Sequence, residues 1–185
     1  MIALRRRTRI TIRRFAVLLG PLVSGLMIQP AFAQDEHPRV EIFGGASYLP
    51  ADNMDFPRND SFGFQTSING NFNRWFGIVG DVGGQYNRTP HTSVHEFLAG
   101  PRFTKRTKRV TVFGHVLVGA SVGHTSIQGF SDRGFTLGGG GGFDINLSPR
   151  IAIRPLQLDY IGSFVDILEN NFRFGSGVVF KFGGN

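Results

Sequence analysis

The chain has 185 residues, no cysteine, 26 glycines and 19 phenylalanines, and only 18% of its residues are charged. This composition excludes a disulfide framework, thiolate metal sites and a disordered chain, and it favours an all-β protein with many turns. The net charge of +7 does not indicate nucleic-acid binding, because six of the 20 basic residues lie in residues 1–33, leaving 14 against the 13 acidic residues elsewhere.

The first 33 residues have the features of an export signal. Residues 1–14 are rich in arginine, residues 15–28 form an apolar run, and the small-x-small sequence of residues 31–33 precedes Gln34. This order predicts a cleaved signal peptide over 1–33 and a mature domain over 34–185. The apolar run is short for a membrane-spanning helix, which is the alternative interpretation. No later apolar run is long enough to span a membrane as a helix, so we expect either a periplasmic protein or an outer-membrane barrel.

The mature chain alternates between apolar and polar residues with a period of two, which predicts β-strands. The clearest segments are 62–72, 76–86, 110–122 and 171–182, where the even positions are largely apolar or glycine. Weaker alternation covers 39–48, 94–103, 135–146 and 151–161. We therefore predict eight strands of about 10 residues each, the length that crosses a bilayer when tilted.

The predicted connectors alternate in length. Short connectors are expected at 73–74, 104–108 and 147–149, and longer polar ones at 49–61, 87–93, 123–134 and 162–170. This pattern is typical of an up-and-down barrel with a periplasmic and an extracellular rim. Because eight is an even number of strands, we expect both ends of the chain to lie in the periplasm.

Residue content predicts which face of the barrel meets lipid. The apolar parity carries Phe, Tyr, Val and Ile, whereas the other parity carries small and polar residues that suit a narrow lumen. We expect Phe64, Ile78, Val116 and Phe180 to point outward. A soluble, lipocalin-like barrel that carries an apolar ligand would instead gather them at its centre. Aromatic residues near strand ends are expected to form interfacial girdles: Tyr48, Phe62, Phe72, Trp75, Phe76, Tyr86, Phe103, Phe135, Tyr160, Phe172 and Phe182.

The segment 151–161 changes parity at Pro155. Ile151 and Ile153 are odd, whereas Leu156, Leu158 and Tyr160 are even. We predict a β-bulge at Pro155, which would keep all these apolar residues outward and turn Arg154 and Asp159 inward.

Several segments carry a family resemblance: "NFNRWFGIVGDVGGQY" (71–86), "EFLAGPRF" (96–103), "VFGHVLVGAS" (112–121), "IAIRPLQLDYI" (151–161) and "NNFRFGSGVVFKFG" (170–183). The chain resembles the small outer-membrane β-barrel family, the fold shared by OmpA-type membrane domains and OmpX-like proteins, over 38–183. The resemblance implies an all-β, eight-stranded antiparallel up-and-down transmembrane β-barrel in the outer membrane of a Gram-negative-type bacterium.

The same resemblance implies an insertion signal in the last strand, read by the barrel-assembly machinery. Its polar, glycine, apolar and aromatic positions match Arg173, Gly175, Val178, Phe180 and Phe182. The chain departs from the family pattern because residues 183–185 follow the final aromatic residue.

Inward parity gathers ionisable residues in the expected lumen: Glu41, Asp81, Glu96, Arg102, His115, Asp144, Arg154, Asp159, Arg173 and Lys181. Buried charges must pair, so this nearly balanced set predicts a salt-bridged network. The network would fill a lumen that has room only for side chains. The functional alternative is a small, low-conductance or gated ion path.

One sequence feature leaves an enzyme open. His124 and Ser126 resemble the histidine–serine pair of PagL-type lipid A deacylases, with Asp132 or Glu169 as the orienting acid. The tripeptide His-Thr-Ser of residues 124–126 also occurs at 91–93, which weakens the match. We therefore expect no enzyme activity. The histidines lack metal-ligand spacing, and the glycine run 138–142 lacks the following Lys-Ser/Thr of a phosphate loop, so we expect no metal and no cofactor.

The sequence therefore predicts an integral outer-membrane component that presents surface loops and has a largely closed lumen. The expected partners are outer-membrane lipids, lipopolysaccharide and the barrel-assembly machinery, and the expected state is a monomer.

Overall fold

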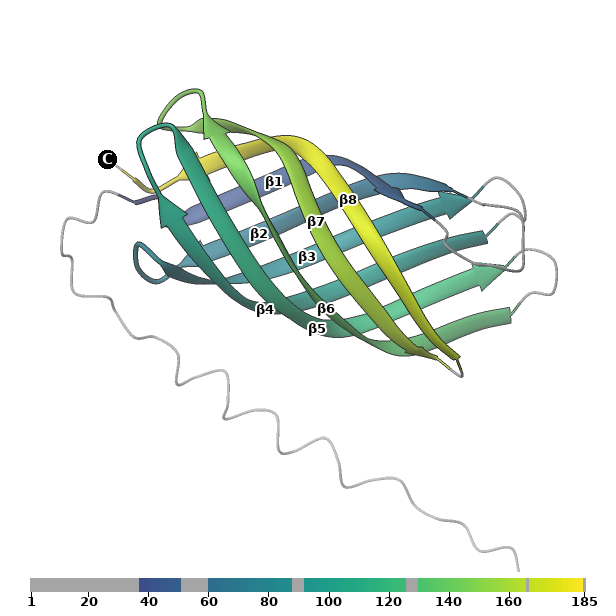
Figure 1. The fold of residues 1–185 in the computed structure, drawn as a ribbon. Coiled ribbons are helices and arrows are strands. Elements are labelled where there is room, and N and C mark those ends of the chain that lie inside the picture. The colour runs from purple at the N-terminus through teal and green to yellow at the C-terminus, as the bar shows by residue number, and fades with distance from the viewer. Residues whose placement is uncertain (1–36, 51–59, 88–91, 126–129, 166, 185) are drawn as a thin grey trace, which may run out of the picture. The chain divides into compact units, whose positions relative to one another are not determined.

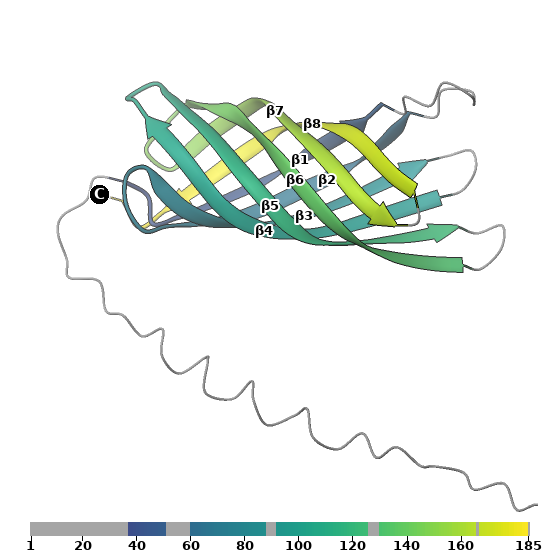
Figure 2. The same ribbon diagram turned by 60° about the horizontal axis from the view of Figure 1, so that its bottom comes forward.

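The computed structural model describes residues 37–50, 60–87, 92–125, 130–165 and 167–184. These residues form eight strands, β1 (Val40–Leu49), β2 (Ser61–Asn71), β3 (Phe76–Asn87), β4 (Thr92–Arg106), β5 (Val110–Thr125), β6 (Phe130–Asn146), β7 (Ile151–Val165) and β8 (Ile167–Phe182). Each strand pairs with its sequence neighbours, and β1 also pairs with β8, so the sheet is a closed antiparallel barrel (Figures 1 and 2). Within the described residues, no helix is long and apolar enough to cross a membrane.

The apolar parity lies on the outside of the barrel, as predicted. Phe64, Ile78, Val116 and Phe180 are 41%, 49%, 60% and 47% exposed. Their polar neighbours on the same strands, such as Gln65 and His115, are buried. Because successive side chains of a strand point to opposite faces, the alternation in the sequence fixes this inversion directly. The soluble-barrel alternative, which needed these apolar residues at the centre, has the opposite arrangement.

The predicted bulge in β7 is confirmed. Arg154 pairs with Gly177 and Gln157 with Gly175, so Pro155 and Leu156 stand opposite the single residue Ser176. The register with β6 shifts at the same place. Proline has no backbone N–H to donate, so it suits a position where the ladder is interrupted. Arg154 and Asp159 are consequently both buried inside the barrel.

The predicted strand lengths were too short for the second half of the chain. The strands β4 to β8 have 15 to 17 residues each, and β5 to β8 extend into the regions 123–134 and 162–170 that were expected to be connectors. Antiparallel pairing satisfies backbone hydrogen bonds whether or not the side chains alternate. An analysis that relies on the alternation of side chains therefore misses the parts of a strand that continue beyond its alternating apolar segment.

Three short turns mark one end of the barrel, together with the paired residues Val40 and Phe182. We call this end the short-turn rim; it comprises 72–75, 107–109 and 147–150. Asn73 Oδ1 accepts hydrogen bonds from the N–H groups of Trp75 and Phe76, and Ser148 Oγ accepts from those of Arg150 and Ile151. Side-chain acceptors of this kind stabilise tight turns locally.

Aromatic side chains gather at the outer surface of the short-turn rim. The rings of Trp75 and Phe103 stack with centroids 6.1 Å apart, and Phe76 packs against both Phe72 and Phe103. At the other end, Tyr48 packs on Phe62, and Tyr160 on Phe172. The aromatic residues therefore form two separate groups along the outer surface, as expected for interfacial girdles.

Candidate functional site: a charged network in the barrel lumen

All ten ionisable residues expected in the lumen lie inside the barrel, each less than one-tenth exposed. They come from seven of the strands, so their side chains converge from different walls. The structure brings them together in two clusters.

The first cluster surrounds Arg173 on β8. Its guanidinium donates to Asp81 on β3, Glu96 on β4 and Asp159 on β7, with each N–O distance 2.8 Å. In the closed ring, β4 and β8 stand on opposite walls. The Arg173–Glu96 pair therefore reaches across the whole width of the lumen.

Other buried side chains add contacts to two of these carboxylates, Asp81 and Asp159. Gln65 donates to Asp81 at 2.8 Å, and Gln157 donates to Asp159 at 2.7 Å. His115 Nε2 lies 2.8 Å from Asp159 Oδ1. A buried charge is tolerated when its remaining lone pairs are satisfied in this way. Three carboxylates surround one arginine here, so we call this group the acidic cluster. It consists of Arg173, Asp81, Glu96, Asp159, Gln65, Gln157 and His115.

A glycine leaves room for the acidic cluster. A Cβ atom at Gly83 would lie 2.8 Å from Arg173 Nη1 and 3.1 Å from Glu96 Oε2. A side chain at this position of β3 would therefore force the ends of the Arg173 and Glu96 side chains to shift.

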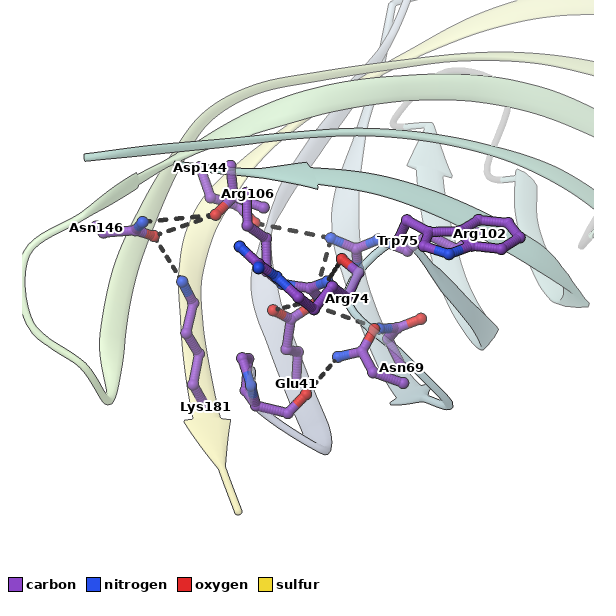
Figure 3. A network of polar contacts seen from close by, with 12 residues as sticks. Glu41, Asn69, Arg74, Trp75, Arg102, Arg106, Asp144, Asn146 and Lys181 are labelled. Carbon is purple, nitrogen blue, oxygen red and sulfur yellow. Dashed lines mark hydrogen bonds and ion pairs between the residues drawn. The ribbon is translucent and has the colours of Figure 1, made fainter. Parts of the chain in front are cut away.

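The second cluster lies nearer the short-turn rim (Figure 3). Arg154 binds Asp144 through two nitrogens, at 2.7 and 3.2 Å. Arg106 contacts Glu41 at 3.2 Å, and Arg102 lies 3.6 Å from Glu41 and 3.7 Å from Asp144. Lys181 donates to Asn146 Oδ1 at 2.5 Å. We call this the basic cluster, because Arg102, Arg106, Arg154 and Lys181 share only the carboxylates of Glu41 and Asp144.

Two aromatic rings lie against arginines of the basic cluster. The guanidinium of Arg154 lies over the rings of Phe43 and Phe113, 4.3 and 4.2 Å from their centroids, and that of Arg102 lies 4.0 Å from the centroid of Phe113. Cation–π contacts of this kind stabilise desolvated arginine. Arg154 also donates to Gln157 at 2.7 Å, so Gln157 joins the two clusters.

Sequence analysis missed Arg106, Phe43 and Phe113 as members of the network. Phe113 has the same parity as the inward residues Thr111 and His115, so a stricter application of the alternation would have found it. Arg106 fell within a predicted connector, whereas β4 extends to this residue. Apolar residues also lie inside the barrel, as the buried cluster of Val79, Leu98, Leu117 and Ile161 shows.

The structure places the other candidate residues as follows. His124 is exposed, whereas Ser126 and the side chains of Asp132 and Glu169 lie outside the described residues. Of the insertion-signal residues, Arg173 and Gly175 point inward, and Val178, Phe180 and Phe182 are exposed on the outer surface. Within the described part of the chain, no group of three or more His, Cys, Asp or Glu side chains could hold a metal ion.

Comparison with known proteins identifies the architecture. The model of the outer membrane protein beta-barrel domain family matches residues 19–182. No curated protein matches the chain.

Three solved structures illustrate the structural similarity. Neisserial surface protein A is 14% identical with a TM-score of 0.61, and the match covers 77% of this chain and 97% of that one. Ail, the attachment invasion locus protein of Yersinia pestis, is 19% identical with a TM-score of 0.53, covering 78% and 99%. OprG from Pseudomonas aeruginosa is 10% identical with a TM-score of 0.58, covering 83% and 100%. At these identities the likeness concerns the fold.

Proposed function

Because the chain belongs to the outer membrane protein beta-barrel domain family and is an outer-membrane β-barrel protein, we propose that it is a structural envelope component with a closed lumen. In this proposal the barrel anchors the protein in lipid and presents surface loops, and it carries out no catalysis. Its partners are outer-membrane lipids, lipopolysaccharide and the barrel-assembly machinery, and it acts as a monomer.

The observation that carries the closed lumen is the bridging position of Arg173. Its three charged hydrogen bonds to β3, β4 and β7 join opposite walls of the barrel. Opening a water path there would require Arg173 to separate from carboxylates on three strands, each of which it holds at 2.8 Å. A network of this kind therefore favours a filled lumen over a conducting one.

The orientation follows from the turns. Outer-membrane barrels have short turns on the periplasmic side and longer loops outside. The short-turn rim, with turns at 72–75, 107–109 and 147–150, is therefore assigned to the periplasm. The connector 50–60 between β1 and β2 is assigned to the cell surface.

Planar-bilayer recording tests the closed lumen against the low-conductance pore. We expect the purified, folded protein to produce no discrete current steps across a range of voltages. Discrete steps from the wild-type protein that change in size in Arg173→Ser, but not in the exposed-residue control Arg133→Ser, would establish the pore instead.

The absence of catalysis has a separate test. Cells that overproduce the protein are expected to contain unchanged lipid A, measured by mass spectrometry. Loss of an acyl chain from lipid A that depends on Ser126 and His124, and disappears in Ser126→Ala, would contradict the proposal.

A further inference from the structure

A pocket of about 560 Å³ opens at the short-turn rim. It is lined by the turns 107–108 and 147–150, by the end of β8 and by residues that follow it. The pocket lies outside the acidic cluster and at the outer edge of the basic cluster, so the closed lumen does not explain it.

The lining of this pocket is strongly basic. Arg106, Lys108, Arg150 and Lys181 contribute four cations, and no acidic residue belongs to the lining. Thr107, Thr111, Asn146 and Ser148 add hydrogen-bonding groups. Several cations with neutral polar groups and no carboxylate form a suitable environment for a multiply hydrogen-bonded anion.

Within the residues that the structure describes, the cations of the pocket have few counter-ions. Lys181 is buried and donates to the neutral amide of Asn146; within the described residues it forms no ion pair. Arg106 must share Glu41 with Arg102, and its Nε has no acceptor within the described residues. Lys108 and Arg150 are exposed and likewise form no ion pair within that part of the chain.

The charges of the lumen accentuate this imbalance. The acidic cluster holds three carboxylates for one arginine and one histidine, whereas the basic cluster holds four cations for two carboxylates. The surplus positive charge therefore lies at the short-turn rim, next to the pocket. Bringing an anion to this place would compensate positive charge that the two carboxylates of the basic cluster do not balance.

Apolar side chains border the pocket on the outer side of the barrel. Leu147 and Phe182 belong to its lining and are 61% and 52% exposed. A soluble anion would gain nothing from such a border. A phospholipid would place its phosphate among the cations and its acyl chains along the outer surface, where lipid already lies.

We propose that this pocket binds a phosphate group, supplied by the headgroup of an anionic phospholipid of the periplasmic leaflet. Arg106, Lys108, Arg150 and Lys181 would donate to the phosphate oxygens. The inference uses the assignment of the short-turn rim to the periplasm, but it does not depend on whether the lumen conducts.

Native mass spectrometry of the detergent-extracted protein tests the proposal with three probes. Phosphatidylglycerol carries phosphate and acyl chains, diacylglycerol carries only the chains, and glycerol 3-phosphate carries only the phosphate. We expect phosphatidylglycerol to bind and diacylglycerol not to bind. Comparable binding of diacylglycerol would overturn phosphate recognition, and glycerol 3-phosphate binding as tightly as the lipid would overturn the lipid source.

Matched variants locate the site. Lys108→Gln/Arg150→Gln removes two exposed cations from the pocket, and Lys105→Gln/Arg109→Gln removes two exposed cations near the same rim that do not line it. We expect the first pair to weaken phosphatidylglycerol binding about tenfold or more, since each basic residue near an anionic headgroup contributes to binding. The control pair should bind within about twofold of wild type. Equal effects of the two pairs would show general charge attraction and overturn the site.

Lys181→Gln tests the buried cation. It should also weaken phosphatidylglycerol binding while the protein keeps the gel migration of a folded barrel. If this variant does not fold, the exposed pair decides the outcome, because neither Lys108 nor Arg150 is buried.

Discussion

At the scale of single residues, the lumen depends on arginines whose charges are shared among several partners. Arg173 satisfies three carboxylates, whereas Arg102 lies between two carboxylates and a phenylalanine ring at longer distances. Removing one member of such a network leaves the others buried and unpaired, which is more destabilising than the loss of a single contact. The network should therefore respond very differently to the loss of a central and of a peripheral member.

Arg173→Met should lower the free energy of unfolding by about 3–5 kcal/mol, because Asp81, Glu96 and Asp159 would lose their common cation. Urea unfolding in lipid vesicles, followed by the fluorescence of the single tryptophan, measures this change. Adding Asp81→Asn and Glu96→Gln to Arg173→Met should recover part of the loss. A change no larger than that of the exposed control Arg133→Met would contradict the central role of Arg173.

At the scale of the elements, the bulge in β7 keeps one continuous apolar face. Pro155 is the extra residue relative to both neighbouring strands, because the register shifts there against β6 and against β8. Ser176 Oγ donates to the carbonyl of Arg154 at 3.2 Å, which occupies one backbone group beside the interruption. A strand that slips by one residue exchanges its two faces.

Deleting Pro155 should therefore sharply reduce the amount of folded protein. Either Arg154 or the apolar residues beyond it must then face the wrong side. An arginine on the lipid face is destabilising by an amount that depends on its depth, up to about 2–4 kcal/mol at the bilayer midplane. Pro155→Ala keeps the residue count and should fold. The fraction of heat-modifiable protein in outer-membrane preparations distinguishes the two variants; equal yields would mean that the bulge does not set the register.

The insertion signal predicted in the last strand is a property of β8 as an element, and it can be tested there. Phe180→Ala should reduce insertion more than Phe172→Ala, although both phenylalanines are exposed on the same strand. The reason is that, of these two residues, only Phe180 occupies a position of the predicted signal. Pulse-chase labelling with protease digestion measures the rate at which folded barrel appears. Equal slowing in both variants would indicate a loss of lipid contact rather than a lost signal.

At the scale of the whole molecule, closure of the sheet removes every unpaired strand edge in the described residues. All backbone groups of a spanning strand need partners within the protein, because lipid offers none. The outward aromatic residues then hold the closed barrel at the two interfaces. Stability of the barrel is consequently cooperative around the ring.

This cooperativity predicts heat-modifiable migration. The unheated protein should stay closed in SDS and migrate differently from the boiled protein, because the ring has no edge from which detergent can open it. Gel electrophoresis of the two samples measures the shift. Identical migration of both samples would contradict a closed barrel that resists SDS.

The sequence by itself determined which residues face lipid and which face the lumen. The reason is local: a period of two assigns each side chain to a face, and the parity change at Pro155 even located the bulge. It also placed Glu41, Asp144 and the other charged residues inside before any partner was known.

Only the tertiary structure decided which of these residues meet. The tilt and stagger of the strands bring Arg173 across to Glu96, insert Phe113 between Arg102 and Arg154, and separate the acidic from the basic cluster. These contacts depend on the register between strands far apart in the chain, and periodicity within one strand carries no information about that register. The basic pocket at the short-turn rim likewise exists only because closure places the end of β8 beside two turns.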